Sequence, residues 1–268
     1  MRFQAFPTFA RVVTRLSPAA LPLMSRRSYA WELRGACFLP FALACVEGGV
    51  IGTIARKAFG AGDLVIAILA AAPALSNISS FLWTRIFHGR NRVRAILALQ
   101  SIILTCVAVI ACAPINTLGT GMIVAAVLIA RFAMAGIIVA RSDLWRANYP
   151  RNARARAAGN LAMVMTLIIG LSGLLIGLIM DLDQAPRFVQ SVARPVLNLL
   201  RIDPSTSDDA YRLFYGGAVI AGLIGIWAFS HVRWRGGVSH ARIERVQRAA
   251  RESTGGPLAM YGVLRDDR

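Results

Sequence analysis

Residues 35–55 read GACFLPFALACVEGGVIGTIA, an apolar run interrupted by one charged side chain, Glu47. A helix of about 20 apolar residues is long enough to cross the hydrocarbon core of a bilayer. Five further runs of similar character follow along the chain: Leu64 to Thr84, Ala95 to Ala113, Leu118 to Ala140, Ala157 to Met180 and Leu213 to Val232. The sequence therefore predicts an all-α membrane protein, a bundle of six transmembrane helices.

The composition agrees with this class of protein. Hydrophobic residues make up 56% of the chain and charged residues only 16%, whereas about a quarter of the residues in a soluble domain are charged. Six spans in 268 residues also leave no room for a soluble domain of ordinary size.

The basic residues that give the net charge of +17 are distributed as the expected topology requires. Of the 30 basic residues, 23 fall in four places: before Gly35, between Arg85 and Arg94, between Arg141 and Arg156, and after His231. The alternate joints carry no such excess. Cytoplasmic loops of membrane proteins are enriched in Lys and Arg, so both termini are predicted to be cytoplasmic. Anionic lipid headgroups of the bilayer, rather than nucleic acid, are the expected partner of this charge.

This pattern divides the chain into three parts. Residues 1–34 form a basic cytoplasmic tail, residues 35–235 form the transmembrane domain with one long external loop at 181–212, and residues 236–268 form a second tail or linker. The first part is rich in Arg and has no acid before Glu32, which an organellar transit peptide would share. A basic tail on the membrane surface is favoured because the segment runs directly into a spanning helix. The expected location is a bacterial inner membrane.

Glu47 is the most informative single residue, because it lies in the middle of the first predicted span. A charge there costs roughly 3 kcal/mol on insertion scales, so the side chain should face protein or water and be paired or protonated. Arg131, in the fourth span, is the expected partner and keeps its charge at any accessible pH. Such a pair can couple substrate or proton movement, or it can be a structural tie. Asn77 and Ser76 can line a polar cavity or bond across helices.

The chain offers little for catalysis or for cofactor binding. The four cysteines lie inside apolar runs, and the three histidines have no Cys or carboxylate neighbours at ligand spacing. A serine elbow, a phosphate loop and a pair of carboxylates are all absent from the sequence. We therefore expect no enzymatic activity, no metal and no cofactor.

Two internal joints carry a resemblance to a known family. Residues 131–136 read RFAMAG and lead through WRANYP at 145–150 to RARAAG at 154–159, before a Gly-rich helix. This order resembles the fourth helix, internal loop and fifth helix of major facilitator superfamily transporters. The joint HGRNR at 88–92 is similar to the family's basic second internal loop. The resemblance implies a set of gating or loop residues: Gly89, Arg90, Arg92, Arg154, Arg156 and Gly159.

The family has twelve helices in two halves, and this chain resembles the N-terminal half. The resemblance implies a secondary active transporter that moves a small solute by alternating access, with a proton as one coupling ion to consider. A second six-helix half or a second copy would complete it. The alternative is a structural subunit or assembly factor of a larger membrane complex. The sequence does not identify the solute.

Overall fold

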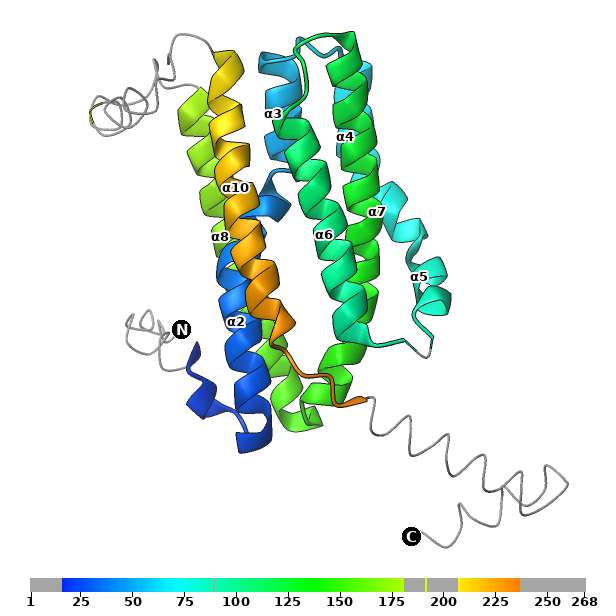
Figure 1. The fold of residues 1–268 in the computed structure, drawn as a ribbon, viewed down its shortest axis with the longest axis vertical. Coiled ribbons are helices and arrows are strands. Elements are labelled where there is room, and N and C mark those ends of the chain that lie inside the picture. The colour runs from blue at the N-terminus through cyan, green and yellow to red at the C-terminus, as the bar shows by residue number, and fades with distance from the viewer. Residues whose placement is uncertain (1–15, 89, 181–190, 192–206, 237–268) are drawn as a thin grey trace, which may run out of the picture.

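The computed structural model describes residues 16–88, 90–180, 191 and 207–236, and these residues are all-helical apart from short connections. Figure 1 shows an upright bundle of long helices. The elements are a short 3₁₀ turn, η1 (Pro18–Ala20), followed by α2 (Leu23–Ala44), α3 (Gly48–Lys57), α4 (Asp63–Ile78), α5 (Ser80–Ile86), α6 (Arg92–Ala111), α7 (Thr117–Asn148), α8 (Arg151–Met180) and α10 (Ser207–Ser230).

Several of these helices are long and apolar enough to cross a membrane. Five spans meet that description: α2 together with α3, α6, α7, α8 and α10. The pair α4 and α5 is bent by 44° at a short break, and counting it as one span brings the number to the predicted six. The chain is therefore an α-helical membrane protein.

The basic joints gather at one end of the bundle. In Figure 1 the lower end holds the starts of α2, α6 and α8 and the ends of α5, α7 and α10. η1, near the start of the described chain, and the segment that follows α10 both lie at this end. This agrees with an even number of crossings, while the side of the membrane that this end faces stays a prediction.

Local sequence explains where the internal helices begin and end. The Asn91 side chain accepts from the Val93 and Arg94 amides and caps α6. The Asn116 side chain accepts from Gly119 N and caps α7 in the same way. Such caps satisfy amides that have no partner within the helix. Pro150 then separates α7 from α8, because the residue before a proline is disfavoured in the helical conformation.

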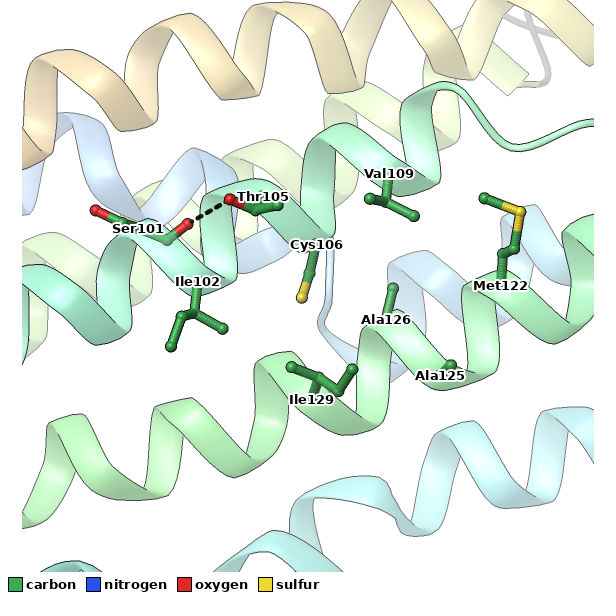
Figure 2. Close-up of a pocket in the computed structure, with 9 residues that line it drawn as sticks. All are labelled: Ser101, Ile102, Thr105, Cys106, Val109, Met122, Ala125, Ala126 and Ile129. Carbon is green, nitrogen blue, oxygen red and sulfur yellow. Dashed lines mark hydrogen bonds between the residues drawn. The ribbon is translucent and has the colours of Figure 1, made fainter. Parts of the chain in front are cut away.

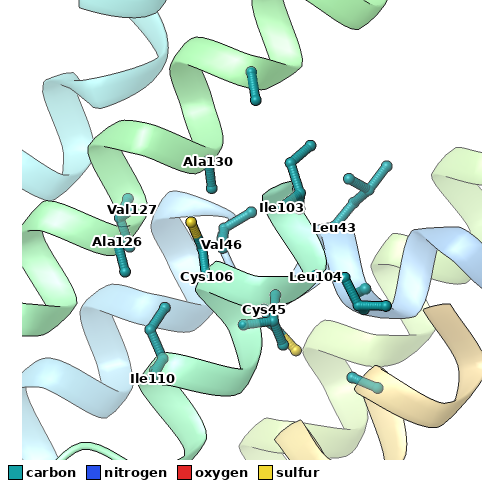
Figure 3. Close-up of a cluster of buried hydrophobic side chains, with 14 of the residues drawn as sticks. Leu43, Cys45, Val46, Ile103, Leu104, Cys106, Ile110, Ala126, Val127 and Ala130 are labelled. Carbon is teal, nitrogen blue, oxygen red and sulfur yellow. The ribbon is translucent and has the colours of Figure 1, made fainter. Parts of the chain in front are cut away.

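The core lies where α2 and α6 meet α7 and α10. Figure 3 shows part of it, with Leu43 and Val46 near Ile103 and Ala130. Small residues allow the closest approaches. A Cβ at Gly225 of α10 would lie 2.7 Å from Leu39 N of α2, so only glycine fits at this crossing.

The helices extend further than the apolar runs predict. α2 begins at Leu23, so the last part of the predicted N-terminal tail is helical. α7 continues to Asn148 and α8 begins at Arg151, although apolar residues alone predicted 140 and 157 as these limits. Hydropathy marks the width of the membrane, whereas a helix ends at a cap or a proline. Most of the external loop and the tail after 236 lie outside the described residues.

The first span differs in a second way. The sequence predicts a continuous helix through Glu47, but α2 ends at Ala44 and α3 begins at Gly48. Glu47 is extended, with φ −75° and ψ 136°, and occupies the N-cap position of α3. Two glycines follow it directly, and glycine is a weak helix former. The span is therefore a broken helix with an acid at its break.

Candidate functional site

The break between α2 and α3 is the centre of the candidate site. The last turn of α2 tightens there, since Val46 N donates to Leu43 O at 3.2 Å and Glu47 N to Ala44 O at 3.0 Å. The regular pattern resumes with Ile51 N donating to Glu47 O. At 1.5 Å per residue, Glu47 lies about 20 Å along the helix from Arg34 and about 13 Å from Arg56. That places the break well inside the span.

Two side chains from other helices satisfy the carbonyls at the break. The Tyr215 hydroxyl of α10 donates to Cys45 O at 2.5 Å. The Arg131 guanidinium of α7 donates from Nε to Val46 O at 3.0 Å. A carbonyl without a donor is costly in hydrocarbon, so irregular backbone is tolerated there only where protein surrounds it. α7 and α10 thus hold the broken span in place.

Arg131 and Glu47 form the predicted ion pair. Arg131 Nη2 lies 2.8 Å from Glu47 Oε2, although the angles at this contact fall outside hydrogen-bond geometry. The Arg131 side chain is 9% exposed and that of Glu47 is 45% exposed. Glu47 also lies at the N-terminus of α3, where the helix dipole favours a negative charge. The partly exposed carboxylate therefore has both a guanidinium and a helix N-terminus beside it.

The surroundings of the pair are open on one side. A Cβ added at Gly49 or Gly52 of α3 would meet no atom of the described structure within 4 Å. α3 contacts α4 on one edge and α8 on another, and α8 is the least buried of the candidate spans. Gly170 and Gly177 of α8 are similarly free of neighbours within 4 Å in the described residues. The described chain thus leaves one face of the site uncovered.

No contact among the described residues brings Asn77 to the Glu47–Arg131 pair. It is exposed on α4, near the bend before α5. Its neighbour Ser76 is buried, and its hydroxyl donates to Pro73 O within the same helix at 2.8 Å. This hydroxyl bond lies in the last turn of α4, just before the bend between α4 and α5.

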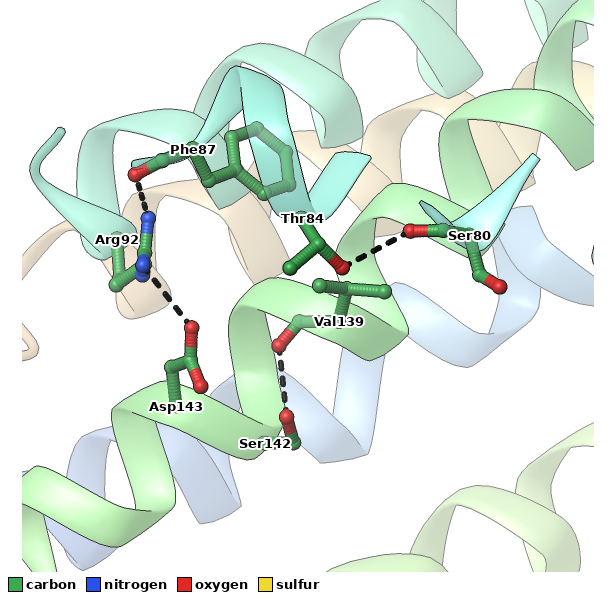
Figure 4. A network of polar contacts seen from close by, with 7 residues as sticks. All are labelled: Ser80, Thr84, Phe87, Arg92, Val139, Ser142 and Asp143. Atoms are coloured by element: carbon green, nitrogen blue, oxygen red, sulfur yellow. Dashed lines mark hydrogen bonds and ion pairs between the residues drawn. The ribbon is translucent and has the colours of Figure 1, made fainter. Parts of the chain in front are cut away.

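The joint at 88–92 is held by an ion pair that the sequence did not point to. Arg92 Nη2 lies 3.0 Å from Asp143 Oδ2 on α7, and the same guanidinium donates to Phe87 O, as Figure 4 shows. Arg90 is exposed, and Gly89 lies outside the described residues. Arg92 and Asp143 therefore tie the start of α6 to the end of α7. Only the three-dimensional packing reveals Asp143 as the partner, since the two residues are far apart in sequence.

The two predicted arginines of the joint between α7 and α8 donate to backbone carbonyls at the same end of the bundle. Arg154 Nη2 donates to Arg146 O at 3.2 Å, which closes the turn between α7 and α8. Arg156 Nη1 donates to Ala20 O at 3.3 Å and so reaches η1. Gly159 is exposed, with no atom of the described residues within 4 Å of its added Cβ.

Sequence reasoning missed a buried acid at this end. Glu32 of α2 is fully buried and accepts from Trp145 Nε1 and from the Tyr149 hydroxyl, both at 2.9 Å. Burial, with the Glu32 charge beside it, raises the pKa of Tyr149, so this phenol keeps the proton it donates. Arg141 is buried nearby, and its guanidinium donates from Nη1 to Met165 Sδ at 3.2 Å. In the sequence, the one feature that pointed to this buried site was that Glu32 is the first acidic residue of the chain.

A groove between α6 and α7 is a poor candidate for a solute site. It has a volume of about 510 Å³, and its lining, shown in Figure 2, is apolar except for Ser101 and Thr105. Both hydroxyls already donate to carbonyls of their own helix, at 3.0 Å. Such a groove offers contacts to a lipid chain and none that would orient a polar solute.

No three His, Cys, Asp or Glu side chains come together as a metal centre among the described residues. Comparisons with protein families, with curated proteins and with solved structures give no match. The function must therefore be argued from the site itself.

Proposed function

We propose that the chain is one half of a secondary active transporter that moves a small solute by alternating access. The observation that supports this most is the broken first span, which carries the Glu47–Arg131 pair at its break. Transporters commonly form their sites from discontinuous helices near the bilayer midplane. Ionisable groups inside a membrane more often mark a pathway than a scaffold.

In this proposal Glu47 is the group that carries the coupling proton. With Glu47 ionised, the charge of Arg131 is neutralised across the 2.8 Å contact. A proton on the carboxylate releases the guanidinium, which keeps its bond to Val46 O and offers its free N–H groups to a solute. The exposed half of Glu47 gives the proton a route to water. The exchange of proton for solute at one arginine couples the two movements.

A second half or a second copy of this chain would complete the cavity. The open face beside Gly49 and Gly52, flanked by α4 and α8, is where the missing wall would lie. We also propose that the basic end of the bundle faces the cytoplasm of a bacterium, since basic loops are retained on that side. The likeness of the internal joints to major facilitator transporters supports the same arrangement.

One observation favours a different function, that of a structural subunit in a larger membrane complex. Gly170 of α8 is exposed and Gly177 is half-buried, and no atom of the described residues lies within 4 Å of a Cβ added at either position. Small residues on a helix allow a partner helix to approach closely. In that case the Glu47–Arg131 pair would only hold the broken span together.

Currents from proteoliposomes on a solid-supported membrane would separate the two functions. The wild-type protein is exposed to a panel of sugars, amino acids and organic anions under a proton gradient. We expect saturable, solute-dependent currents that Glu47→Gln abolishes at equal protein incorporation. Asp63→Asn is the matched control, because Asp63 pairs with an exposed Arg56 at the other end of the bundle. Undiminished currents in Glu47→Gln would remove Glu47 from the site.

A further inference from the structure

A cluster of rings and cations lies on the seam between α2 and α10, away from the candidate site. The Trp31 ring stacks on His231 at 4.4 Å between centroids and meets Trp227 edge-on at 5.8 Å. The guanidinium of Arg34 lies over Trp31, with Cζ 4.3 Å from the ring centroid. A cation over an indole face is attracted by the ring, so this stack fixes where the Arg34 charge lies.

Exposed apolar surface continues from this cluster toward the middle of the bundle. Trp227 is 59% exposed. One to two turns further toward the middle of the same helices, Phe38, Leu223 and Ile224 are exposed apolar residues. Trp rings concentrate where hydrocarbon meets headgroups. From Arg34 to Arg56 the first span rises roughly 33 Å, about the thickness of a bilayer core. The cluster therefore lies at headgroup depth on the basic side.

Arg34 has no acidic partner in the described part of the chain. Its contact is the Trp31 ring. The nearest acid in sequence, Glu32, is buried on the other side of α2, where it accepts from Trp145 and Tyr149. The positive charge of Arg34 is therefore exposed, held in place and without a counter-ion among the described residues, at the depth where lipid phosphates lie.

We propose that this cluster binds the phosphate of an anionic phospholipid. The Arg34 guanidinium would donate two parallel N–H bonds to the phosphate oxygens, the geometry that favours Arg for this group. The half-exposed Trp227 ring would pack on the glycerol region, and the acyl chains would run along Phe38 and Leu223. This lipid site does not depend on the transport function.

Lipid retention by the purified full-length protein tests the proposal. The protein is stripped of lipid in detergent, mixed with equal amounts of phosphatidylglycerol and phosphatidylcholine, and examined by native mass spectrometry. Wild-type protein should retain phosphatidylglycerol preferentially. Arg34→Gln should lower that retention about tenfold, the loss of one charge-assisted bidentate contact. Arg94→Gln is the matched control, because Arg94 is an exposed Arg at the same end of the bundle, on α6. It should leave retention unchanged.

Other outcomes would overturn the site. Wild-type protein without a preference for phosphatidylglycerol contradicts it, and so does an equal loss in Arg94→Gln, which would indicate diffuse attraction by the whole basic end. Gel filtration and circular dichroism check that Arg34→Gln is folded. If it is not, the exposed Trp227 provides the second variant: Trp227→Leu should weaken retention several-fold, and wild-type retention in that variant would contradict the proposal.

Discussion

Arg131 stabilises the helix break through one guanidinium that faces two groups, Val46 O and the Glu47 carboxylate. Arg131→Ala removes both contacts, so a carbonyl in the core loses its donor and the acid loses its counter-charge. We expect it to lower the free energy of unfolding by about 3 kcal/mol. Glu47→Gln leaves the buried Arg131 charge without its counter-charge, but it keeps an acceptor for the guanidinium and the bond to Val46 O, so a smaller loss of about 2 kcal/mol is expected. Unfolding in SDS measures both, and a larger loss in Glu47→Gln would contradict this account.

Tyr215 makes the second side-chain hydrogen bond to the backbone at the break. Its hydroxyl donates to Cys45 O at 2.5 Å, whereas the equally buried Tyr211 contacts Ala113 O only at 3.4 Å. Tyr215→Phe should therefore cost about 1–3 kcal/mol, the usual penalty for a buried acceptor left without a donor. Tyr211→Phe, the same chemical change one turn earlier, should cost clearly less. Equal losses in the two variants would mean that Cys45 O does not need this donor.

The partner of a single residue could be predicted from the sequence where an unpaired charge would cost much free energy and only one partner was available. A charge in a span needs a partner, and Arg131 was the available cation, so the pair with Glu47 is confirmed by their 2.8 Å separation. Glu32 and Asp143 were missed because each lies near basic residues in sequence, where an acid needs no special explanation. Their partners, Tyr149 and Arg92, come from other helices and are visible only after folding.

For the helices, the sequence predicts which ones exist and in what order better than it predicts where each one begins and ends. The apolar runs correspond to α2–α3, α4–α5, α6, α7, α8 and α10, in that order. The two breaks, at 45–47 and at Ser79, were not predicted, although weak helix formers lie at both: Gly48 and Gly49 follow the first, and Ser76, Asn77 and Ser80 flank the second. At the first break, Tyr215 and Arg131 of other helices donate to the carbonyls that lack a regular partner. A single sequence does not show such partners.

The crossing of α2 and α10 gives a prediction at this scale. Gly225 leaves only 2.7 Å between a would-be Cβ and Leu39 N, a backbone atom that cannot move aside. Gly225→Ala should force α10 away from α2 and destabilise the protein by about 1–3 kcal/mol, the usual cost of overpacking. Gly217→Ala on the same helix meets no described atom within 4 Å and should be neutral or slightly stabilising. Thermal unfolding in detergent compares the two, and similar melting temperatures would refute the close crossing.

At the scale of the whole molecule, the topology is open to direct measurement. The turn between α6 and α7 lies at the end of the bundle opposite the basic joints. A cysteine at Ile115, which is 41% exposed and leaves the Asn116 cap intact, should react with a membrane-impermeant maleimide only from outside the cell. A background without the four native cysteines is the control. Labelling only from the cytoplasmic side would invert the proposed orientation.

The uncovered face beside Glu47 is the feature of the whole molecule on which the proposed function depends. In an isolated copy, the ion pair and the broken span lie beside a face that the described residues leave uncovered. A transporter half of this kind should work only when a second half or copy covers that face. The rate per molecule should then depend on how many copies share a vesicle.

Uptake measured at several protein densities tests this most directly. Reconstituted protein is diluted with lipid until mass photometry finds single copies, and uptake of the solute identified from the current panel is measured at each density. We expect uptake per molecule to fall toward zero as monomers come to dominate, and to be restored by added copies. Robust, saturable uptake by proven monomers, unchanged per molecule across all densities, would contradict it.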